Sequence, residues 1–362
     1  MTTAYADPPP RVVGIDLHRR RSVVVTKDAM TGVPAGPPVH VTNSAEALVA
    51  AVAPAGPGAR VVLEATYGWY WAVDALRRAG FDVTLAHPSG CVGFKHRRVK
   101  NDEVDAADLA DLLRLERLPE AWIAPVAVRE LREMVRYRHT LVHKRTACKN
   151  QVHAVLAKNG LIGAASDLFG VAGRAWLDRR PLPRVYASEI ASLLGLIDTL
   201  DGQVSEYDQR IAHTLAGDPG YRAVQTIPGV GPVLASIFVA EIGDVTRFAS
   251  PAKLCSWAGL TPRHYESDIT VHRGRITRQG SSLVRYAAGE AVQRQRQDNP
   301  ITAIRGRVAS RRPKQVSTVA AARKLLTYVY YALRDHHVRA LRKPTGPCDR
   351  SGQPGREVPV PA

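Results

Sequence analysis

The first third of the chain alternates short apolar runs with segments of helical periodicity. The runs predict strands over residues 12–17, 22–26, 60–63 and 81–86, and the periodic segments predict helices over 44–52, 69–79 and 102–115. Ser44 is placed to cap the first of these helices. The HRRR link between the first two strands is so short that they should pair antiparallel. Strands separated by helices predict an α/β sheet layered with helices over residues 11–125.

Residues 126–216 have the pattern of long helices. Apolar residues at heptad spacing predict a coiled-coil seam of about three to four heptads, made of Ile190, Leu193, Ile197, Leu200, Val204, Tyr207 and Ile211. A second helix, near 129–158, has a seam interrupted by Arg138, Arg145 and Lys149, so one side could pair while another contacts phosphate. The seam predicts a homo-oligomer, a dimer or tetramer; pairing with the 129–158 helix inside one chain is the alternative. Residues 160–184 are expected to be a loop or small insertion.

The last block, 217–342, is expected to be mostly helical, with helices near 283–296 and 316–341. A polar, arginine-rich stretch without helical periodicity lies at 263–281. The Pro-rich residues 1–10 and the Pro/Gly-rich residues 343–362 predict a disordered arm and tail. The expected fold class is therefore α/β plus α.

Charge points to a polyanionic partner. The 362 residues contain 50 Lys and Arg against 33 Asp and Glu, a formal net charge of +17. Contacts between basic residues and phosphates release counterions, so this excess favours nucleic acid. The four cysteines lie far apart, which argues against a zinc knuckle or a disulfide framework. With no apolar stretch of about 18 residues and no signal-peptide pattern, we expect a cytoplasmic protein without membrane contact.

Acidic residues end two predicted strands and begin one predicted helix. Asp16 ends VVGID, and Glu64 ends VVLE. Asp102 and Asp105 lie three residues apart, on one helix face. Four converging carboxylates suit Mg²⁺ or Mn²⁺, and two such ions could clamp the attacking and leaving oxygens of a phosphodiester. Taken singly, each acid could instead serve a turn, a cap or a solvated face. Two further acids extend this helix face and could take a place in the set, namely Asp108 and Asp111.

Two features of the last block could contact or cut a nucleic acid. The segment IPGVGPVLASIFVAEIG resembles a helix-hairpin-helix, in which Gly229 and Gly231 would let backbone amides approach a phosphate, although many tight turns share this pattern. Ser267 lies among cations that could stabilise charge on a phosphoryl group: Arg263, His264, His272, Arg273, Arg275 and Arg278. From these residues alone, a turn formed with Asp268 is the simpler interpretation of Ser267.

The order GIDLH, VVLEATYGWYWAVDALRRAGFDVTLAHP and KNDEVDAADLADLL resembles the N-terminal DEDD domain of the insertion-sequence-110 family of transposases. This resemblance implies a Holliday-resolvase-like ribonuclease-H fold. It also implies that the family's four acids fall on Asp16, Glu64, Asp102 and Asp105, with Lys100 as the basic residue ahead of the helical pair.

The segment RFASPAKLCSWAGLTPRHYESDITVHRGRITRQGSSLVRYAAGEAV resembles the C-terminal transposase domain of the same family. The resemblance implies that Ser267 attacks a phosphodiester and forms a covalent phosphoserine. The family often has Ser-Gly where this chain has Ser-Asp, and an adjacent carboxylate could disfavour a phosphate. The other candidates are Ser281 and Ser282.

Taken as a whole, the resemblance implies a recombinase that joins donor and target DNA in composite active sites across an oligomer. It further implies a structured guide RNA from the element's non-coding end. Two other functions fit the residues: a junction-resolvase-like endonuclease that uses only metal and water, and a catalytically silent nucleic-acid-binding protein.

Overall fold

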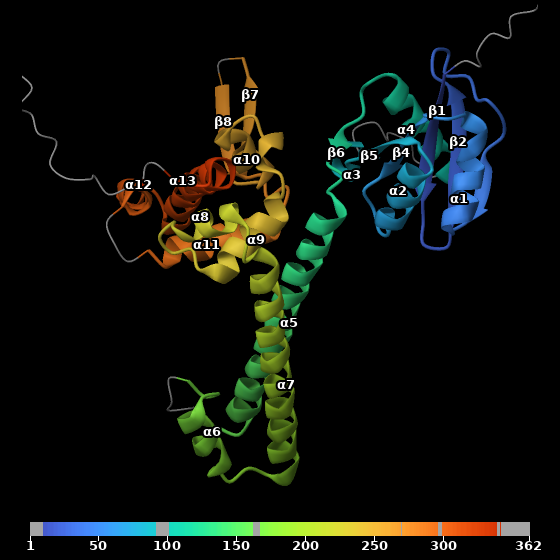
Figure 1. Cartoon of the computed structure of the whole chain (residues 1–362). Helices are drawn as coiled ribbons and strands as arrows, with labels where there is room; N and C mark the ends of the chain where they lie inside the picture. Colours follow the sequence, from blue (N-terminus) through green and yellow to red (C-terminus); the bar gives the residue numbers. More distant parts are fainter. Residues whose placement is uncertain are drawn as a thin grey trace, which may run out of the picture. The chain divides into compact units, whose positions relative to one another are not determined.

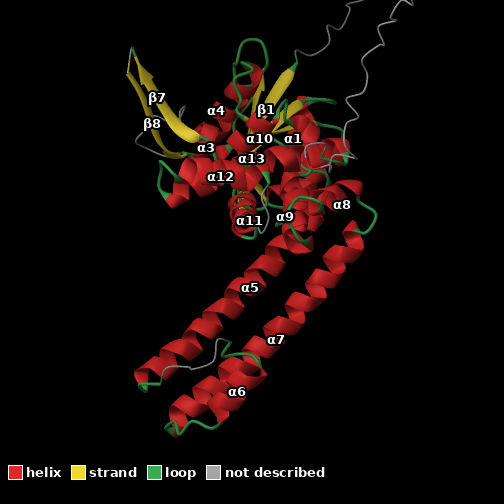
Figure 2. Cartoon of the chain, turned by 90° about the vertical axis from the view of Figure 1, so that its left-hand side faces the viewer, coloured by secondary structure: helices red, strands yellow, loops and turns green. Residues whose placement is uncertain are grey.

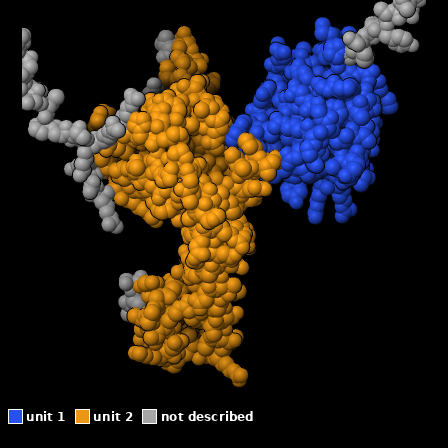
Figure 3. All heavy atoms as spheres, viewed as in Figure 1, with its two compact units in different colours: residues 1–124 blue, residues 125–362 orange. Residues whose placement is uncertain are grey.

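The computed structural model describes residues 10–91, 101–161, 167–268, 270–295, 299–338 and 341 (Figure 1). The expected arm, apart from residue 10, and the expected tail lie outside these residues. The chain divides into two compact units, residues 1–124 and 125–362, which Figure 3 colours separately. Each unit is described by itself.

The first unit is built on a mixed sheet with the strand order β3-β2-β1-β4-β5-β6. Its strands are β1 (Arg11–Leu17), β2 (Arg21–Asp28), β3 (Val39–Thr42), β4 (Arg60–Glu64), β5 (Asp82–Ala86) and β6 (Glu120–Ala121). Strand β1 pairs antiparallel with β2 and parallel with β4, and β4 pairs parallel with β5. The four predicted strands and the antiparallel pairing are confirmed, and the short edge strands β3 and β6 are additional.

Helices cover both faces of this sheet. They are α1 (Ala45–Val52), the 3-10 turn η1 (Ala53–Ala55), α2 (Trp69–Arg78), α3 (Pro88–Cys91) and α4 (Asp102–Arg114). Side chains alternate along a strand, so Val13 and Ile15 of β1 join the core under α1 and α2, whereas Val12 packs with α4. The Ser44 side chain caps α1 by accepting from the Ala47 amide, as predicted. Helix α4 thus lies on the opposite face from α1 and α2.

The second unit begins with two long helices, α5 (Val126–Lys158) and α7 (Arg184–Leu215), which run side by side (Figure 2). Their pairing is antiparallel, because Arg138 pairs with Asp208 and Arg145 with Asp201. The heptad seam of α7 is buried against α5 of the same chain. This is the intramolecular alternative, so the seam no longer argues for an oligomer. Helix α6 (Val171–Asp178) lies in the segment that was expected to be a loop or insertion.

The remaining elements belong to the same unit, and residues of their helices form one core with the start of α5 and the end of α7. These elements are α8 (Pro219–Gln225), α9 (Pro232–Ile242), η3 (Val245–Arg247), α10 (Pro251–Trp257), β7 (Pro262–Ser267), β8 (Thr270–Ile276), α11 (Ser282–Gln293), α12 (Pro300–Ala309) and α13 (Lys314–Asp335). Leu325, Leu326 and Val329 of α13 are fully buried in this core. Helices α11 and α13 confirm the two predicted helices, while the hairpin β7–β8 and α12 were not predicted. Among the described residues, no helix is long and apolar enough to cross a membrane.

Candidate active site

The predicted acids gather at one edge of the first unit's sheet. Strands β1 and β4 run parallel with Ile15 opposite Leu63, so Asp16 and Glu64 follow at the same edge. The first turn of α4 contributes Asp105. These three acids line one cavity of about 270 Å³, here called the acid cavity. Its lining is Asp16, Leu17, His18, Arg19, Glu64, Thr66, Tyr67 and Asp105.

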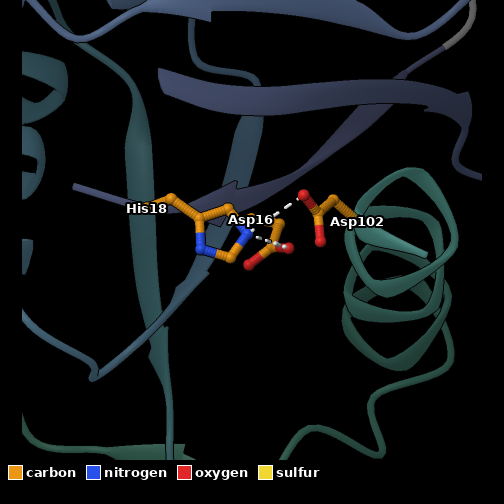
Figure 4. Close-up of side chains that lie close together, drawn as sticks. All are labelled: Asp16, His18 and Asp102. Carbon is orange, nitrogen blue, oxygen red and sulfur yellow. Dashed lines mark ion pairs between the residues drawn. The ribbon is translucent and has the colours of Figure 1, made fainter. Parts of the chain in front are cut away.

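The fourth predicted acid, Asp102, lies next to His18, which also contacts Asp16. His18 Nε2 lies 3.1 Å from Asp16 Oδ2 and 3.3 Å from Asp102 Oδ2, so one imidazole nitrogen faces both carboxylates (Figure 4). His18 was not among the predicted site residues. Its position was a usable signal, because the alternation of β1, continued one residue past Leu17, turns His18 to the face of Asp16.

A close approach of α4 to β1 sets this geometry. An ideal Cβ on Gly14 would overlap the carbonyl oxygen of Ala106 and stand 2.8 Å from the amide nitrogen of Ala110. Only glycine therefore lets the α4 backbone come this near to β1. Asn101 caps the helix by accepting from the Glu103 amide at 3.0 Å. The acidic first turn of α4 is thereby held beside the end of β1.

Farther along α4, an ion pair anchors the helix to β2. Lys27 Nζ, which is almost completely buried, lies 2.6 Å from Asp111 Oδ2, and Arg114 Nε lies 2.7 Å from Asp111 Oδ1. Burial alone would raise the pKa of Asp111, but hydrogen bonds from Lys27 and Arg114 lower it below its usual value. Asp111, an alternative member of the acid set, thus holds the helix in place.

The cluster fits a divalent cation. Asp16, His18 and Asp102 each offer one ligand atom, and these atoms all lie within 4.8 Å of one another. Ligand atoms about 2.1 Å from one ion are roughly 3 to 4 Å apart, and the two distances from His18 Nε2, 3.1 and 3.3 Å, fall in this range. The carboxylates supply the hard oxygen donors that Mg²⁺ and Mn²⁺ accept.

Ser267 ends β7, in an exposed hairpin of the second unit. It pairs with Thr270 of β8, and Asp268, which follows it, has a φ of 51°. All of β7 is exposed. The base of the hairpin is held by Arg285, whose Nη1 donates to the carbonyl oxygens of Gln279 at 2.7 Å and Ala258 at 3.1 Å. Ser267 is therefore exposed next to the turn of a hairpin whose base is held in place by Arg285.

The other predicted serines occupy a helix start. Ser281 caps α11 by accepting from the Val284 amide, and Ser282 is the first residue of that helix. The Ser281 oxygen, which already accepts this hydrogen bond, is a less available nucleophile than the strand-end hydroxyl of Ser267.

The residues predicted to contact nucleic acid differ in their exposure and in their partners. Arg275 of β8 and Arg278 after it are exposed, and Arg273 lies opposite His264 in the hairpin register. Lys100 lies outside the described residues. The three basic residues of α5 make contacts inside the unit. Arg138 and Arg145 pair with aspartates of α7, and Lys149 lies over the Phe169 ring at 4.7 Å.

Gly229 and Gly231 lie in the turn between α8 and α9. Gly229 has a φ of 80°, and a Cβ there would stand 2.6 Å from Gln295 Nε2. Gly231 directly precedes α9 as its N-cap residue, and the space at its Cβ position is open. Both glycines line a cavity of about 520 Å³ together with Gln293 and Arg294. The missing side chain of Gly229 thus allows close packing against Gln295, and the backbone of Gly231 is accessible in the same cavity as Arg294.

Comparison with known proteins covers both units. Residues 13–159 match a family model described as Transposase, of the DEDD type from IS110 elements. Residues 221–303 match a second model, described as Transposase IS116/IS110/IS902 family. The class that these two matches define is that of the insertion-sequence transposases. The chain belongs to the IS110/IS116 family of such transposases.

Individual relatives agree with this assignment. The chain is 28% identical over 268 residues to the "Probable family 20 transposase" of Pseudomonas aeruginosa, covering 70% of this chain and 78% of that protein. It is 25% identical over 218 residues to the transposase for insertion sequence element IS1328 of Yersinia enterocolitica, covering 58% and 63%. Over 74 residues it is 36% identical to the pilin gene-inverting protein of Moraxella lacunata, covering 19% and 23%.

Proposed function

We propose that this protein is the DNA recombinase of an insertion sequence, which cuts and rejoins DNA strands. The observation that carries the proposal is the convergence of Asp16, Glu64 and Asp105 on one cavity, with Asp102 tied to Asp16 through His18. The first unit is proposed to have a ribonuclease-H-like fold. Its strand order and the antiparallel β1–β2 pair followed by the parallel β4 and β5 support this.

The carboxylates are proposed to hold Mg²⁺ or Mn²⁺. A divalent ion there would polarise the phosphodiester and offset the charge that develops on its oxygens. Asp16 and Glu64 are fixed by the sheet, and Asp102 and Asp105 are fixed by the packing of α4 on β1. These residues therefore keep the donor oxygens in position without a mobile loop. Arg19 and Tyr67 at the same cavity are suited to contact the phosphate and a base of the DNA strand.

Ser267 is proposed as the nucleophile. Its Oγ would form a bond to phosphorus while a phosphodiester P–O bond breaks, so one DNA end becomes linked to the protein. The Oγ proton is lost to solvent, and the departing oxygen gains a proton to become a free hydroxyl end. The exposed Arg275 and Arg278 would offset charge on the phosphoryl oxygens. Attack by the released hydroxyl of another strand on the phosphoserine would rejoin DNA and restore Ser267.

Donor and target DNA are the proposed substrates, and a guide RNA from the element is a proposed partner. The net charge of +17 supports nucleic-acid binding in general. The name of the Moraxella relative, a gene-inverting protein, supports a reaction in which cut strands are rejoined. A homo-oligomer stays part of the proposal, but it needs a surface other than the α7 seam, which α5 covers.

A metal-and-water endonuclease is the second candidate. The observation that favours it is that every residue lining the acid cavity belongs to the first unit, among residues 16–105. Such a cavity could direct water at a phosphodiester without Ser267.

The proposed metal chemistry is tested by strand cleavage with Asp16→Asn. We expect cleavage of labelled DNA in Mg²⁺ or Mn²⁺ to fall by about a hundredfold or more, because the variant loses a metal-binding charge. Binding of the DNA should change little. The control is Asp82→Asn, which alters an exposed acid at the start of β5. Full cleavage by the Asp16 variant would contradict the assignment.

A further inference from the structure

We propose that His18 is a nitrogen ligand of the metal ion held by Asp16 and Asp102, and that this nitrogen makes the site prefer Mn²⁺ to Mg²⁺. The inference rests on the proposed function, because it adds a ligand to the same carboxylate site. It starts from the histidine that faces both acids at the end of β1 (Figure 4).

The two distances from His18 suit neighbouring ligands of one ion. Adjacent ligands of an octahedral ion, each about 2.1 Å from it, lie roughly 3 Å apart. His18 Nε2 lies 3.1 Å and 3.3 Å from the two carboxylate oxygens. Nε2 is also a buried atom that makes no hydrogen bond of acceptable geometry among the described residues. The nitrogen therefore points at the place where the oxygens converge, without being committed to a directed hydrogen bond.

The backbone of His18 is fixed independently of any ion. Its carbonyl oxygen accepts from Asn43 Nδ2 at 2.7 Å, and Ser22 Oγ, in a fully buried residue, donates to Asn43 Oδ1 at 2.7 Å. The Asn43 amide donates in turn to the Arg20 carbonyl oxygen at 3.0 Å. These contacts hold the turn after β1, so the imidazole is placed beside Asp16 in advance. Pre-placement of this kind is what a ligand needs.

The donor type decides the metal preference. Mg²⁺ selects oxygen ligands and keeps its waters, whereas imidazole nitrogen suits transition metals. Mn²⁺ accepts carboxylates as readily as Mg²⁺ does and tolerates nitrogen better. A site with two aspartates and one histidine should therefore favour Mn²⁺ over Mg²⁺ more strongly than an all-carboxylate site would.

The test is Mn²⁺ binding to the full chain, followed by electron spin echo envelope modulation of the bound ion. Imidazole coordination should give a ¹⁴N coupling in the wild type. His18→Leu and His18→Gln should abolish the coupling and weaken Mn²⁺ binding by about tenfold or more, while Mg²⁺ competition changes less. The matched control is His40→Ala, which removes a histidine whose Nε2 lies 3.0 Å from Glu103 Oε1 of α4. It should keep both the coupling and the affinity.

The outcomes separate this inference from the proposed function. Tight Mn²⁺ binding without ¹⁴N coupling would overturn the His18 ligand and leave the carboxylate site intact. A coupling that persists in both His18 variants would overturn it too, because another residue would then be the ligand. Failure of the wild type to bind either ion would reject the metal site itself, and with it the proposed function.

Discussion

The carbonyl oxygen of Ala106 occupies the space in which a side chain at Gly14 would begin. This contact presses the second turn of α4 against the middle of β1. Asp16 follows Gly14 by two residues on the same strand face, and Asp102 and Asp105 precede Ala106 on the same helix. A single missing Cβ thus sets the distance between the strand acid and the helix acids.

Gly14→Ala is therefore expected to damage the site and the fold together. The added methyl must push α4 away from β1, at a cost of about 1–3 kcal/mol in the free energy of unfolding. Mn²⁺ affinity should fall because Asp102 and Asp105 move away from Asp16. Chemical denaturation and metal titration measure both effects. Gly36→Ala is the matched control, because a Cβ there meets open space. Wild-type metal affinity in the Gly14 variant would disprove the packing argument.

The Lys27–Asp111 pair gives a prediction about pH. Asp111→Asn leaves the ammonium of Lys27, in a residue only 8% exposed, without its charged partner, so we expect a loss of about 1–3 kcal/mol at about pH 7. The pKa of Asp111 is lowered in the folded protein. Its stabilisation is thus present above the unfolded pKa of about 3.9 and is lost as the pH falls through the folded pKa. The difference between the unfolding free energies of the two proteins should shrink as the pH falls below the unfolded pKa of Asp111. A difference that stays constant as the pH falls would refute this.

Tyr67 should contribute to DNA affinity. It lines the acid cavity and is 82% exposed, so its ring is available for stacking on a base. Tyr67→Ala should weaken binding of single-stranded DNA by about tenfold, and Tyr67→Phe should bind normally. Met30→Ala removes another exposed apolar side chain of the first unit and is the control. Fluorescence anisotropy measures the affinities, and equal values for all four proteins would exclude a stacking role.

Variants of Asp268, the residue after Ser267, can test the effect of backbone conformation separately from the effect of side-chain charge. Asp268 has a φ of 51°, which Asn and Gly adopt readily and a β-branched residue does not. Asp268→Asn and Asp268→Gly should keep the turn and raise the cleavage rate severalfold, because a carboxylate beside the phosphate is removed. Asp268→Val should lower the rate. Equal rates for the Asn and Val variants would show that the turn conformation is unimportant.

Local signals predicted much of the fold. Apolar runs marked β1, β2, β4 and β5, and the Ser44 cap marked the start of α1. The β7–β8 hairpin was not predicted, because its exposed strands have no alternation of apolar and polar residues. Helix α12 was missed although Asn299 and Thr302 form a capping box around Pro300. The heptad seam could not reveal its partner, because a helix of the same chain and one of another chain satisfy the same pattern.

The candidate site was predictable where acids end strands or begin a helix. Asp16, Glu64 and Asp105 do line one cavity. Sequence spacing could not distinguish Asp111, which is three residues from Asp108 on the same helix but pairs with Lys27. Sequence spacing also could not reveal that Arg138 and Arg145 form ion pairs with aspartates of α7, because those aspartates lie 70 and 56 residues farther along the chain.

The proposed recombinase forms a covalent bond between Ser267 and DNA during its reaction. This bond is measured directly by denaturing electrophoresis of labelled DNA after incubation with protein, Mn²⁺ and the element's RNA, followed by mass spectrometry of the retarded band. We expect a DNA adduct on Ser267 in the wild type and in Ser281→Ala, and none in Ser267→Ala. Cleavage that persists in Ser267→Ala, without any adduct in the wild type, would refute the covalent step and favour hydrolysis by metal and water.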